Sequence, residues 1–183
     1  MKRLFGTDGV RSVAGQYPLD APTIRVLGRA LIDLLKEEGL EPRVLVGRDT
    51  RESGPWIEQT LASGIKAGGG ETVSAGIIPT SAVSFLTRKH RFSAGIVISA
   101  SHNPYRDNGI KVFSSEGIKI SDEWEMRIEK TILEGKRKTA SLSEGKAVRP
   151  QPELSDDYED FLIGQLPKTQ IPEDLSVVLD CDN

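Results

Sequence analysis

Residues 94–99 constrain the fold more than any other segment, because they are apolar on both faces of an extended strand. Strands of this kind are typical of parallel sheets that helices cover on both sides. Two other short apolar segments, residues 43–47 and 71–78, precede this one, and segments with the helical spacing of apolar residues separate the three. This alternation predicts an α/β fold.

Capping and breaking residues mark the helices. Asp20 provides a capping carboxylate, and Gly39 provides a stop signal for the helix between them. Further helices are predicted around residues 57–65, from Pro79 to about His90, and from Ser121 onward. Residues 114–116 separate two short apolar segments, 110–113 and 117–120, which predicts a hairpin. We therefore expect a mixed, mostly parallel sheet flanked by helices.

The chain divides into three parts. Residues 1–150 form the predicted α/β domain. Residues 151–174 are expected to be a connector with a short acidic helix at residues 156–166. The connector is expected because residues 136–153 are polar, contain Pro150 and Pro152 and have no clear period. Residues 175–183 begin with the pattern of a buried strand and then stop. We interpret them as the first strand of a second domain that this chain does not contain.

Charge and cysteine content argue against several classes of protein. The formal net charge of −3 disfavours non-specific binding to nucleic acid or to an anionic membrane. The single cysteine, Cys181, rules out an internal disulfide framework and suits a reducing compartment. No apolar run approaches the roughly 20 residues that span a bilayer, and the N-terminus lacks the apolar core of a signal sequence. A soluble cytoplasmic protein is expected.

The loop Ser99-Ala-Ser-His-Asn-Pro104 is the strongest candidate site. Ser101 follows the carboxyl end of a predicted strand, where open α/β sheets bind their ligands. A phosphoryl group on this serine would carry a charge of about −1.5 to −2 and would need nearby cations. From the residues alone, a polar turn with no catalytic role is the favoured alternative. A serine hydrolase is disfavoured, because sequence neighbours rarely form a nucleophile–base pair.

Two candidate partners follow Ser101 in the chain. His102 can exchange a proton near neutral pH, and structural and functional roles for it are equally open. Lys111 comes after Asp107-Asn108-Gly109, a turn that could bring its ammonium back toward Ser101. An exposed strand lysine is the alternative. His90 lies at a predicted helix end, where a surface role is favoured.

Two earlier segments offer arginines. Arg11 ends the motif Phe5-Gly-Thr-Asp-Gly-Val-Arg11, a glycine-containing loop that precedes any predicted helix or strand and could present the guanidinium to a phosphate. The motif Gly47-Arg-Asp-Thr-Arg51 lies at a predicted strand end. We expect an Arg–Asp pair from this second motif to brace the site rather than to take part in catalysis.

Together, these motifs resemble those of the α-D-phosphohexomutase family. The matching segments are residues 5–11, 47–54 and 94–113, in the order and spacing of the family, and the similarity extends from about residue 3 to the end. Ser12 stands where a glycine usually follows the arginine, and Ser81 stands where a second proline is common.

The resemblance implies a reaction and the residues that carry it out. Ser101 would carry phosphate, give it to a hexose phosphate to form a bisphosphorylated sugar, and receive the other phosphate back. Mg²⁺ would contact the phosphate on Ser101. Arg11 and Lys111 match positions linked to proton transfer and phosphoryl stabilisation, and His102 matches a position close to the phosphoserine.

The resemblance also implies what these 183 residues can do alone. Family members have four domains, and this chain resembles the first, a connector and the first strand of the second. A non-catalytic fragment is therefore the hypothesis for the isolated chain. For the full-length protein, glucosamine phosphate is the favoured substrate, and glucose or mannose phosphates are the alternatives. Homodimer formation is left open.

Overall fold

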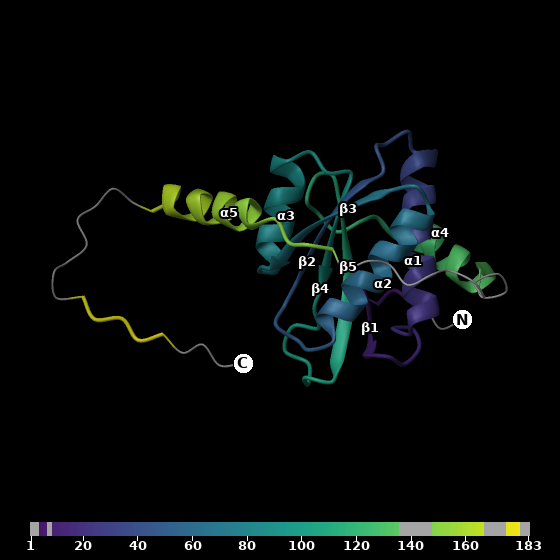
Figure 1. The fold of residues 1–183 in the computed structure, drawn as a ribbon, viewed down its shortest axis with the longest axis horizontal. Helices are drawn as coiled ribbons and strands as arrows, with labels where there is room; N and C mark the ends of the chain where they lie inside the picture. Colours follow the sequence, from purple (N-terminus) through teal and green to yellow (C-terminus); the bar gives the residue numbers. More distant parts are fainter. Residues whose placement is uncertain (1–3, 7–8, 136–147, 167–174, 180–183) are drawn as a thin grey trace.

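The computed structural model describes residues 4–6, 9–135, 148–166 and 175–179. In these ranges a five-stranded sheet has the order β1-β5-β4-β2-β3. Strand β2 pairs in parallel with β3 and β4, whereas β5 is antiparallel to both β4 and β1. The predicted mixed, mostly parallel α/β sheet is confirmed (Figure 1). The strands are β1 (Val10–Val13), β2 (Arg43–Arg48), β3 (Glu71–Ile77), β4 (Ala94–Ile98) and β5 (Asp107–Ser114).

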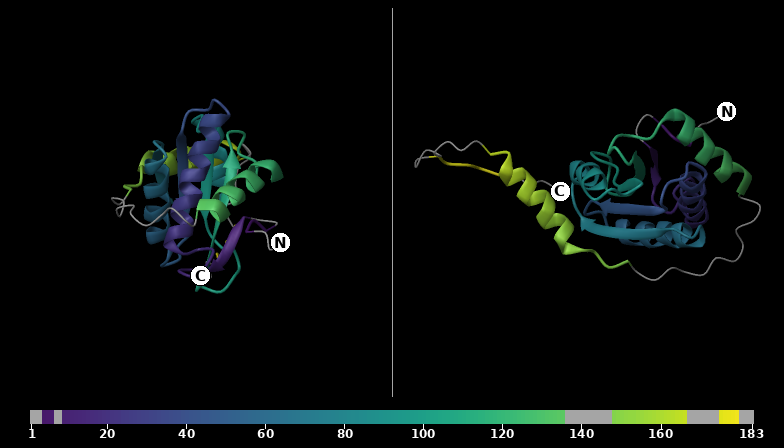
Figure 2. Two further views of the ribbon diagram at one scale, coloured as in Figure 1. Left: turned by 90° about the vertical axis from the view of Figure 1, so that its right-hand side faces the viewer. Right: turned by 90° about the horizontal axis from the view of Figure 1, so that it is seen from above.

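Helices cover both faces of the sheet (Figures 1 and 2). Apolar side chains of α1, α2 and α4 form one core with one face of the strands. Helix α3 forms a second core on the other face, and Leu154 of α5 joins it. The helices are α1 (Ala21–Glu37), α2 (Gly54–Ala67), α3 (Thr80–Lys89), α4 (Asp122–Gly135) and α5 (Pro152–Gly164).

The central strand and the first helix form as the sequence pattern predicts. Every residue of β4 is buried, which agrees with helices on both sides of it. At the start of α1, Oδ1 of Asp20 accepts the backbone N–H of Thr23 at 2.8 Å, the capping contact expected there. Gly39, just beyond the helix, has a φ of +72°, a conformation that glycine adopts without strain.

The position of Arg11 differs from the prediction. The sequence placed it in a loop, but it lies in β1, where it is paired with Gly109 of β5. Strand β1 has four residues, and only Val10 among them is buried. So short a segment has no period of its own, and its strand conformation comes from hydrogen bonds to β5.

The predicted hairpin forms, although its second arm is too short to count as a strand of the sheet. Its turn forms, since the N–H of Gly117 donates to the carbonyl of Ser114 at 2.9 Å. The second arm is short: Ser114 N–H donates to the carbonyl of Ile118 at 2.8 Å, Ile120 N–H donates to that of Val112 at 3.1 Å, and Phe113 and Lys119 form an antiparallel bridge between them. Beside the turn, Ser84 of α3 donates through Oγ to the carbonyl of Gly117 at 2.5 Å. The main antiparallel part of the sheet comes from β5, which runs back along β4 and β1.

Helix α5 packs against α3 through aromatic rings and extends away from the sheet (Figure 2). The ring of Phe161 stacks on Phe85 with the centroids 4.1 Å apart, and both lie near Tyr158. Residues 175–179 form neither helix nor strand, and their apolar side chains are exposed. Cys181 lies outside the described residues. The domain limits at 150 and 174 stay predictions.

Candidate active site

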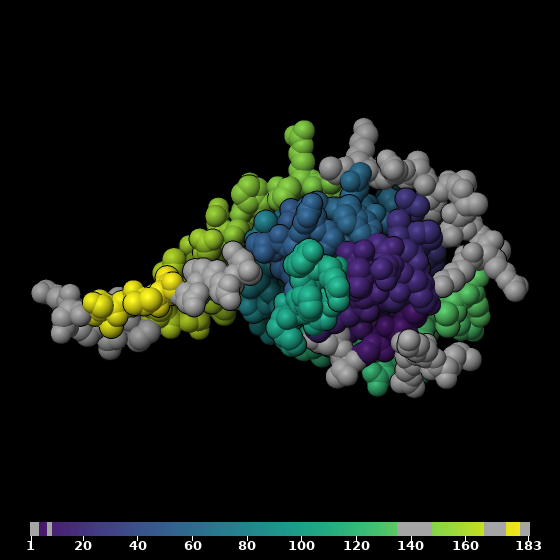
Figure 3. All heavy atoms as spheres, turned by 90° about the horizontal axis from the view of Figure 1, so that it is seen from below, coloured from purple at the N-terminus to yellow at the C-terminus, as the bar shows by residue number. Residues whose placement is uncertain are grey.

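A cleft lies at the carboxyl edge of the sheet, where the parallel strands β2, β3 and β4 end. It has a volume of about 1230 Å³ and is lined by residues 49–53, 78–80, 99, 101–103, 105 and 106, among others. Figure 3 looks onto this edge. The segment around residues 100–107 (teal) stands beside the N-terminal segment (purple) and the segment that follows β2 (blue). Segments far apart in sequence therefore meet around the predicted serine.

Ser101 has an unusual backbone conformation. Its φ is +55°, in the left-handed region that residues other than glycine rarely adopt. Such a conformation costs on the order of 1–3 kcal/mol and persists only where the surroundings enforce it. The side chain is exposed to the cleft, and the backbone N–H donates to Oγ of Ser99 at 3.0 Å. The hydroxyl is thus held on a strained, outward-facing turn.

The two histidines have different surroundings. His102 is exposed in the cleft, and its Nδ1 lies 3.5 Å from Oγ of Ser101. This distance brings the ring beside the hydroxyl but is at the long limit for a hydrogen bond. His90 lies at the end of α3, with Nε2 2.7 Å from a carboxylate oxygen of Asp157 on α5. Of the surface and helix-terminal roles open to His90, the structure supports the helix-terminal one, because His90 is the C-cap residue of α3.

Arg11 and Lys111 lie on the same face of the sheet as Val97, and neither is among the described residues that line the cleft. Arg11 is opposite Gly109 in the β1–β5 pair, and Lys111 is opposite Val97 in the β4–β5 pair. Residues two apart on a strand share a face, so both cations project from the face of Val97, which lines the cleft. Nζ of Lys111 lies 5.4 Å from the centroid of the Phe113 ring.

Gly109 allows β5 to approach the base of the serine loop. A Cβ there would lie 2.6 Å from the carbonyl oxygen of Ser99 and 3.0 Å from Cγ of Arg11. The chain reversal that the sequence assigned to residues 107–109 occurs earlier. The N–H of Asp107 donates to the carbonyl of Pro104 at 2.9 Å, and Asp107 already begins β5.

Arg51 braces the serine loop from the segment after β2. Its Nη2 donates to the carbonyls of Ser101 and Asn103 at 2.7 and 2.9 Å. Its Nη1 donates to those of Pro104 and Asp107 at 2.7 and 3.1 Å. Nε donates to Oδ2 of Asp49 at 3.0 Å. The bracing Arg–Asp pair that the sequence suggested is confirmed, with Arg51 and Asp49 as its members.

Two buried polar residues near the cleft were missed from the sequence. The Asn108 side chain is buried, and its Nδ2 donates to Oγ of Ser53 at 2.9 Å while its Oδ1 accepts the N–H of Gly109. The Glu58 carboxylate is also buried and accepts from Nε of Arg48 at 3.1 Å and from Oγ of Ser74. Neither residue has a local pattern that distinguishes it from a surface residue.

The described residues do not form a metal cage. In those ranges no three His, Cys, Asp or Glu side chains cluster as metal ligands would. None of the helices there has the length and apolar character that crossing a bilayer requires.

The sequence profile of the family described as phosphoglucomutase/phosphomannomutase, α/β/α domain I, matches residues 2–139. The chain belongs to this family. The resemblance to the α-D-phosphohexomutases is therefore confirmed over the residues that carry the cleft. The sequence motifs, the fold and the profile agree on the same segment of the chain.

Individual relatives give the same picture. The chain is 48% identical to the phosphoglucosamine mutase of Koribacter versatilis (strain Ellin345) and 46% identical to that of Syntrophus aciditrophicus (strain SB), with 100% of this chain covered in both. It spans about 40% of the length of these relatives. A phosphoglucomutase/phosphomannomutase family protein from Burkholderia thailandensis superposes with a TM-score of 0.74 at 28% identity, covering 91% of this chain and 36% of that one.

Proposed function

We propose that the full-length protein that contains this chain is a phosphoglucosamine mutase, which interconverts glucosamine 6-phosphate and glucosamine 1-phosphate. The observation that carries this proposal is the 48% identity to a phosphoglucosamine mutase over the whole of this chain. Because the chain spans about 40% of that relative, the activity is proposed for the complete polypeptide. The isolated chain is proposed to be non-catalytic.

In the proposed reaction, Ser101 carries a phosphoryl group between two positions of the sugar. The bond from phosphorus to Oγ of Ser101 breaks as a sugar hydroxyl forms a bond to phosphorus. The hydroxyl releases its proton, and the serine oxygen takes one up. The bisphosphorylated sugar then reorients and returns its other phosphate to Oγ. Such transfers depend mostly on positioning and on charge stabilisation, and the strained, exposed conformation of Ser101 supports this role.

Arg11, Lys111 and His102 are proposed to assist the transfer. Positive charges placed before the reaction stabilise the charge that develops on the transferring group. The strand register supports this role for Arg11 and Lys111, because both project from the same sheet face as Val97, which lines the cleft. The 3.5 Å distance from Oγ of Ser101 supports a role for His102 in orienting the hydroxyl or moving its proton.

Mg²⁺ is proposed as the cofactor of the full-length protein, with an oxygen of the Ser101 phosphate as one ligand. The described residues do not fit a complete site, because no cluster of potential ligand side chains occurs among them. The proposed phosphoryl transfer is therefore described without a step at the ion. A bound divalent ion would supply charge stabilisation to the phosphoryl group. Its remaining ligands are expected outside this chain.

A cytoplasmic location is proposed as well. It is supported by the single cysteine and by the net charge of −3, which suit a reducing compartment and argue against an anionic surface as a partner. The proposed substrate is a hexose phosphate. Association of two copies into a homodimer stays open.

A substrate panel tests the proposed function. The purified full-length protein, supplied with Mg²⁺ and a hexose 1,6-bisphosphate as a phosphoryl donor, should turn over glucosamine phosphate with a higher kcat/KM than glucose or mannose phosphates. Robust turnover of glucose 1-phosphate with none of the amino sugar would instead assign a phosphoglucomutase. The 183-residue chain is the matched control, and mutase activity from it alone would contradict the non-catalytic assignment.

A further inference from the structure

Arg51 makes an unusually complete set of contacts. A guanidinium has five N–H donors and no acceptor. In Arg51 all five have an acceptor: four loop carbonyls and the Asp49 carboxylate. We call the guanidinium with the carbonyl oxygens of Ser101, Asn103, Pro104 and Asp107 the Arg51 clamp. It joins the segment after β2 to the loop between β4 and β5, some 50 residues further along the chain.

We propose that Arg51 is a positioning residue: the clamp fixes the backbone of the serine loop and thereby aims the Ser101 hydroxyl into the cleft. This inference rests on the proposed function only for its effect on turnover. A positive φ at a serine requires surroundings that enforce it. The contact from Nη2 to the carbonyl of Ser101 itself, at 2.7 Å, restrains the peptide group that follows this residue.

A role as a substrate ligand fits the geometry less well. With all five donors in use, a phosphate could bind Arg51 only after displacing a loop carbonyl or Asp49. The side chain is only 11% exposed, although Arg51 is itself among the residues that line the cleft. Asp49 contributes twice to the orientation, because its two carboxylate oxygens accept from Nε and from the backbone N–H of Arg51.

A lysine at position 51 could not make the contacts of the Arg51 clamp. The planar guanidinium reaches four carbonyls with two pairs of donors, whereas an ammonium donates three bonds from a single point. Two contacts of Asn103 are local, since its N–H donates to Ala100 and its Nδ2 donates to Asp107. At the far end of the loop, the N–H of Ala14 donates to the carbonyl of Arg106 at 3.0 Å. Among these contacts, those of Arg51 tie the turn at residues 101–104 to the segment after β2.

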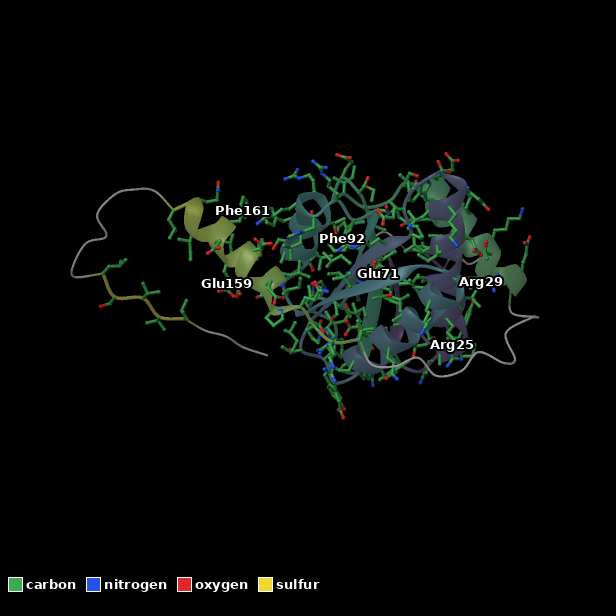
Figure 4. The ribbon with its side chains drawn as sticks, turned by 45° about the horizontal axis from the view of Figure 1, so that its top comes forward. Arg25, Arg29, Glu71, Phe92, Glu159 and Phe161 are labelled. Carbon is green, nitrogen blue, oxygen red and sulfur yellow. The ribbon has the colours of Figure 1, made fainter. Side chains whose placement is uncertain are left out.

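The first arm of the test measures the loop without any assay of activity. Amide hydrogen exchange is compared between the wild-type 183-residue chain and its R51A, R51K and R29A variants. Exchange at Asn103 and Asp107 should rise about tenfold or more in R51A and R51K, because local opening controls it. Arg29, labelled on α1 in Figure 4, is 56% exposed and pairs with Asp33, so R29A is the matched control and should leave the loop unchanged.

The second arm uses the full-length protein. A misplacement of about 1 Å can cost about 100-fold in rate, so R51A should lower kcat by about that factor with KM changed less than about threefold. Free guanidinium at millimolar concentration, far below denaturing levels, should restore part of the kcat of R51A. R51K should not be rescued. A purely structural role would show a lowered melting temperature without this selective rescue.

The outcomes separate the two proposals. Unchanged exchange at Asn103 and Asp107 in a folded R51A would overturn the clamp, and so would an effect on KM alone, which would make Arg51 a ligand. A different result would separate the two. If amide exchange in the loop rises in R51A but the wild-type full-length protein turns over no hexose phosphate, the clamp is supported and the proposed function is contradicted. If R51A fails to fold, D49N tests the clamp instead, because it keeps the Arg51 guanidinium but removes the carboxylate charge that orients it. D49N should raise exchange at the same amides by a smaller factor, and no change would overturn the clamp.

Discussion

The serine loop and α5 are both attached to the same sheet, but by different forces. The loop is held by directional polar bonds from Arg51 and by a close backbone approach at Gly109. Helix α5 is held by the buried Leu154 and by stacked aromatic rings, of which Phe161 is labelled in Figure 4. Partly exposed polar contacts, such as that between Lys89 and Asp157, add to them. Apolar contact has no preferred direction, whereas hydrogen bonds do. The difference indicates that the serine loop depends on directional contacts to its backbone more than α5 does.

The largest difference should appear when one methyl group is added to each region. In G109A the Cβ would meet the carbonyl oxygen of Ser99 at 2.6 Å, a backbone atom that cannot move freely. We expect a loss of about 3 kcal/mol in the free energy of unfolding and faster amide exchange in the serine loop. Urea unfolding and hydrogen exchange measure both.

G164A is the matched control in α5. A Cβ at Gly164 meets nothing within 4 Å, and alanine favours the helix by up to about 1 kcal/mol over glycine. This variant should be as stable as the wild type or slightly more stable. Equal destabilisation by both substitutions would remove the contrast between the two regions.

The second prediction removes the apolar anchor of α5. Leu154 is buried in the core formed with α3, and Leu→Ala substitutions at such sites cost about 2 kcal/mol or more. L154A should accelerate amide exchange throughout α5 and leave Asn103 and Asp107 of the serine loop unaffected. Faster exchange in the loop as well would show that the two regions are not independent.

The smallest effect concerns the ion pair between α5 and α3. The hydrogen bond from Lys89 lowers the pKa of Asp157 below its ordinary value of 3.8, and the contact with His90 lowers it further. A lowered pKa in the folded state means that the carboxylate stabilises α5 above about pH 4 and that this contribution is lost as the pH falls through the folded value.

The D157N variant tests the direction of this pH dependence of stability. At pH 7 and low salt the variant should be less stable by about 0.5 kcal/mol, the usual magnitude for an exposed pair. Thermal melts at decreasing pH should show this difference shrinking below pH 3.8. A difference that stays constant from neutral to acid pH would exclude the charge as its cause.

The sequence predicted the parts of the fold that depend on local pattern. Residues 94–98 are apolar on both faces, so their burial follows directly, and Asp20 caps α1 because the capping contact lies within one turn. The strand containing Arg11 was not predicted, because four residues with one buried side chain carry no period. Its structure comes from β5, which lies about 100 residues away in sequence.

The residues of the candidate site also divide into those that a local sequence pattern predicted and those that depend on contacts from distant segments. Ser101 was identified from its place after a strand, and the Arg–Asp brace was identified from its motif. The five acceptors of Arg51 could not be predicted, since four of them are backbone carbonyls and any residue type supplies a carbonyl. The same holds for the burial of Asn108 and for the positive φ of Ser101, which depend on contacts from distant segments.

The phosphorylation state of Ser101, together with the activity of S101A, tests the central claim most directly. A peptide map of freshly purified full-length protein should place a phosphate on the peptide that contains Ser101. The S101A variant should fold normally, carry no phosphate at this position and isomerise hexose phosphates at least about 10³-fold more slowly. Turnover by S101A at the wild-type rate would contradict the proposal that this hydroxyl carries the phosphoryl group.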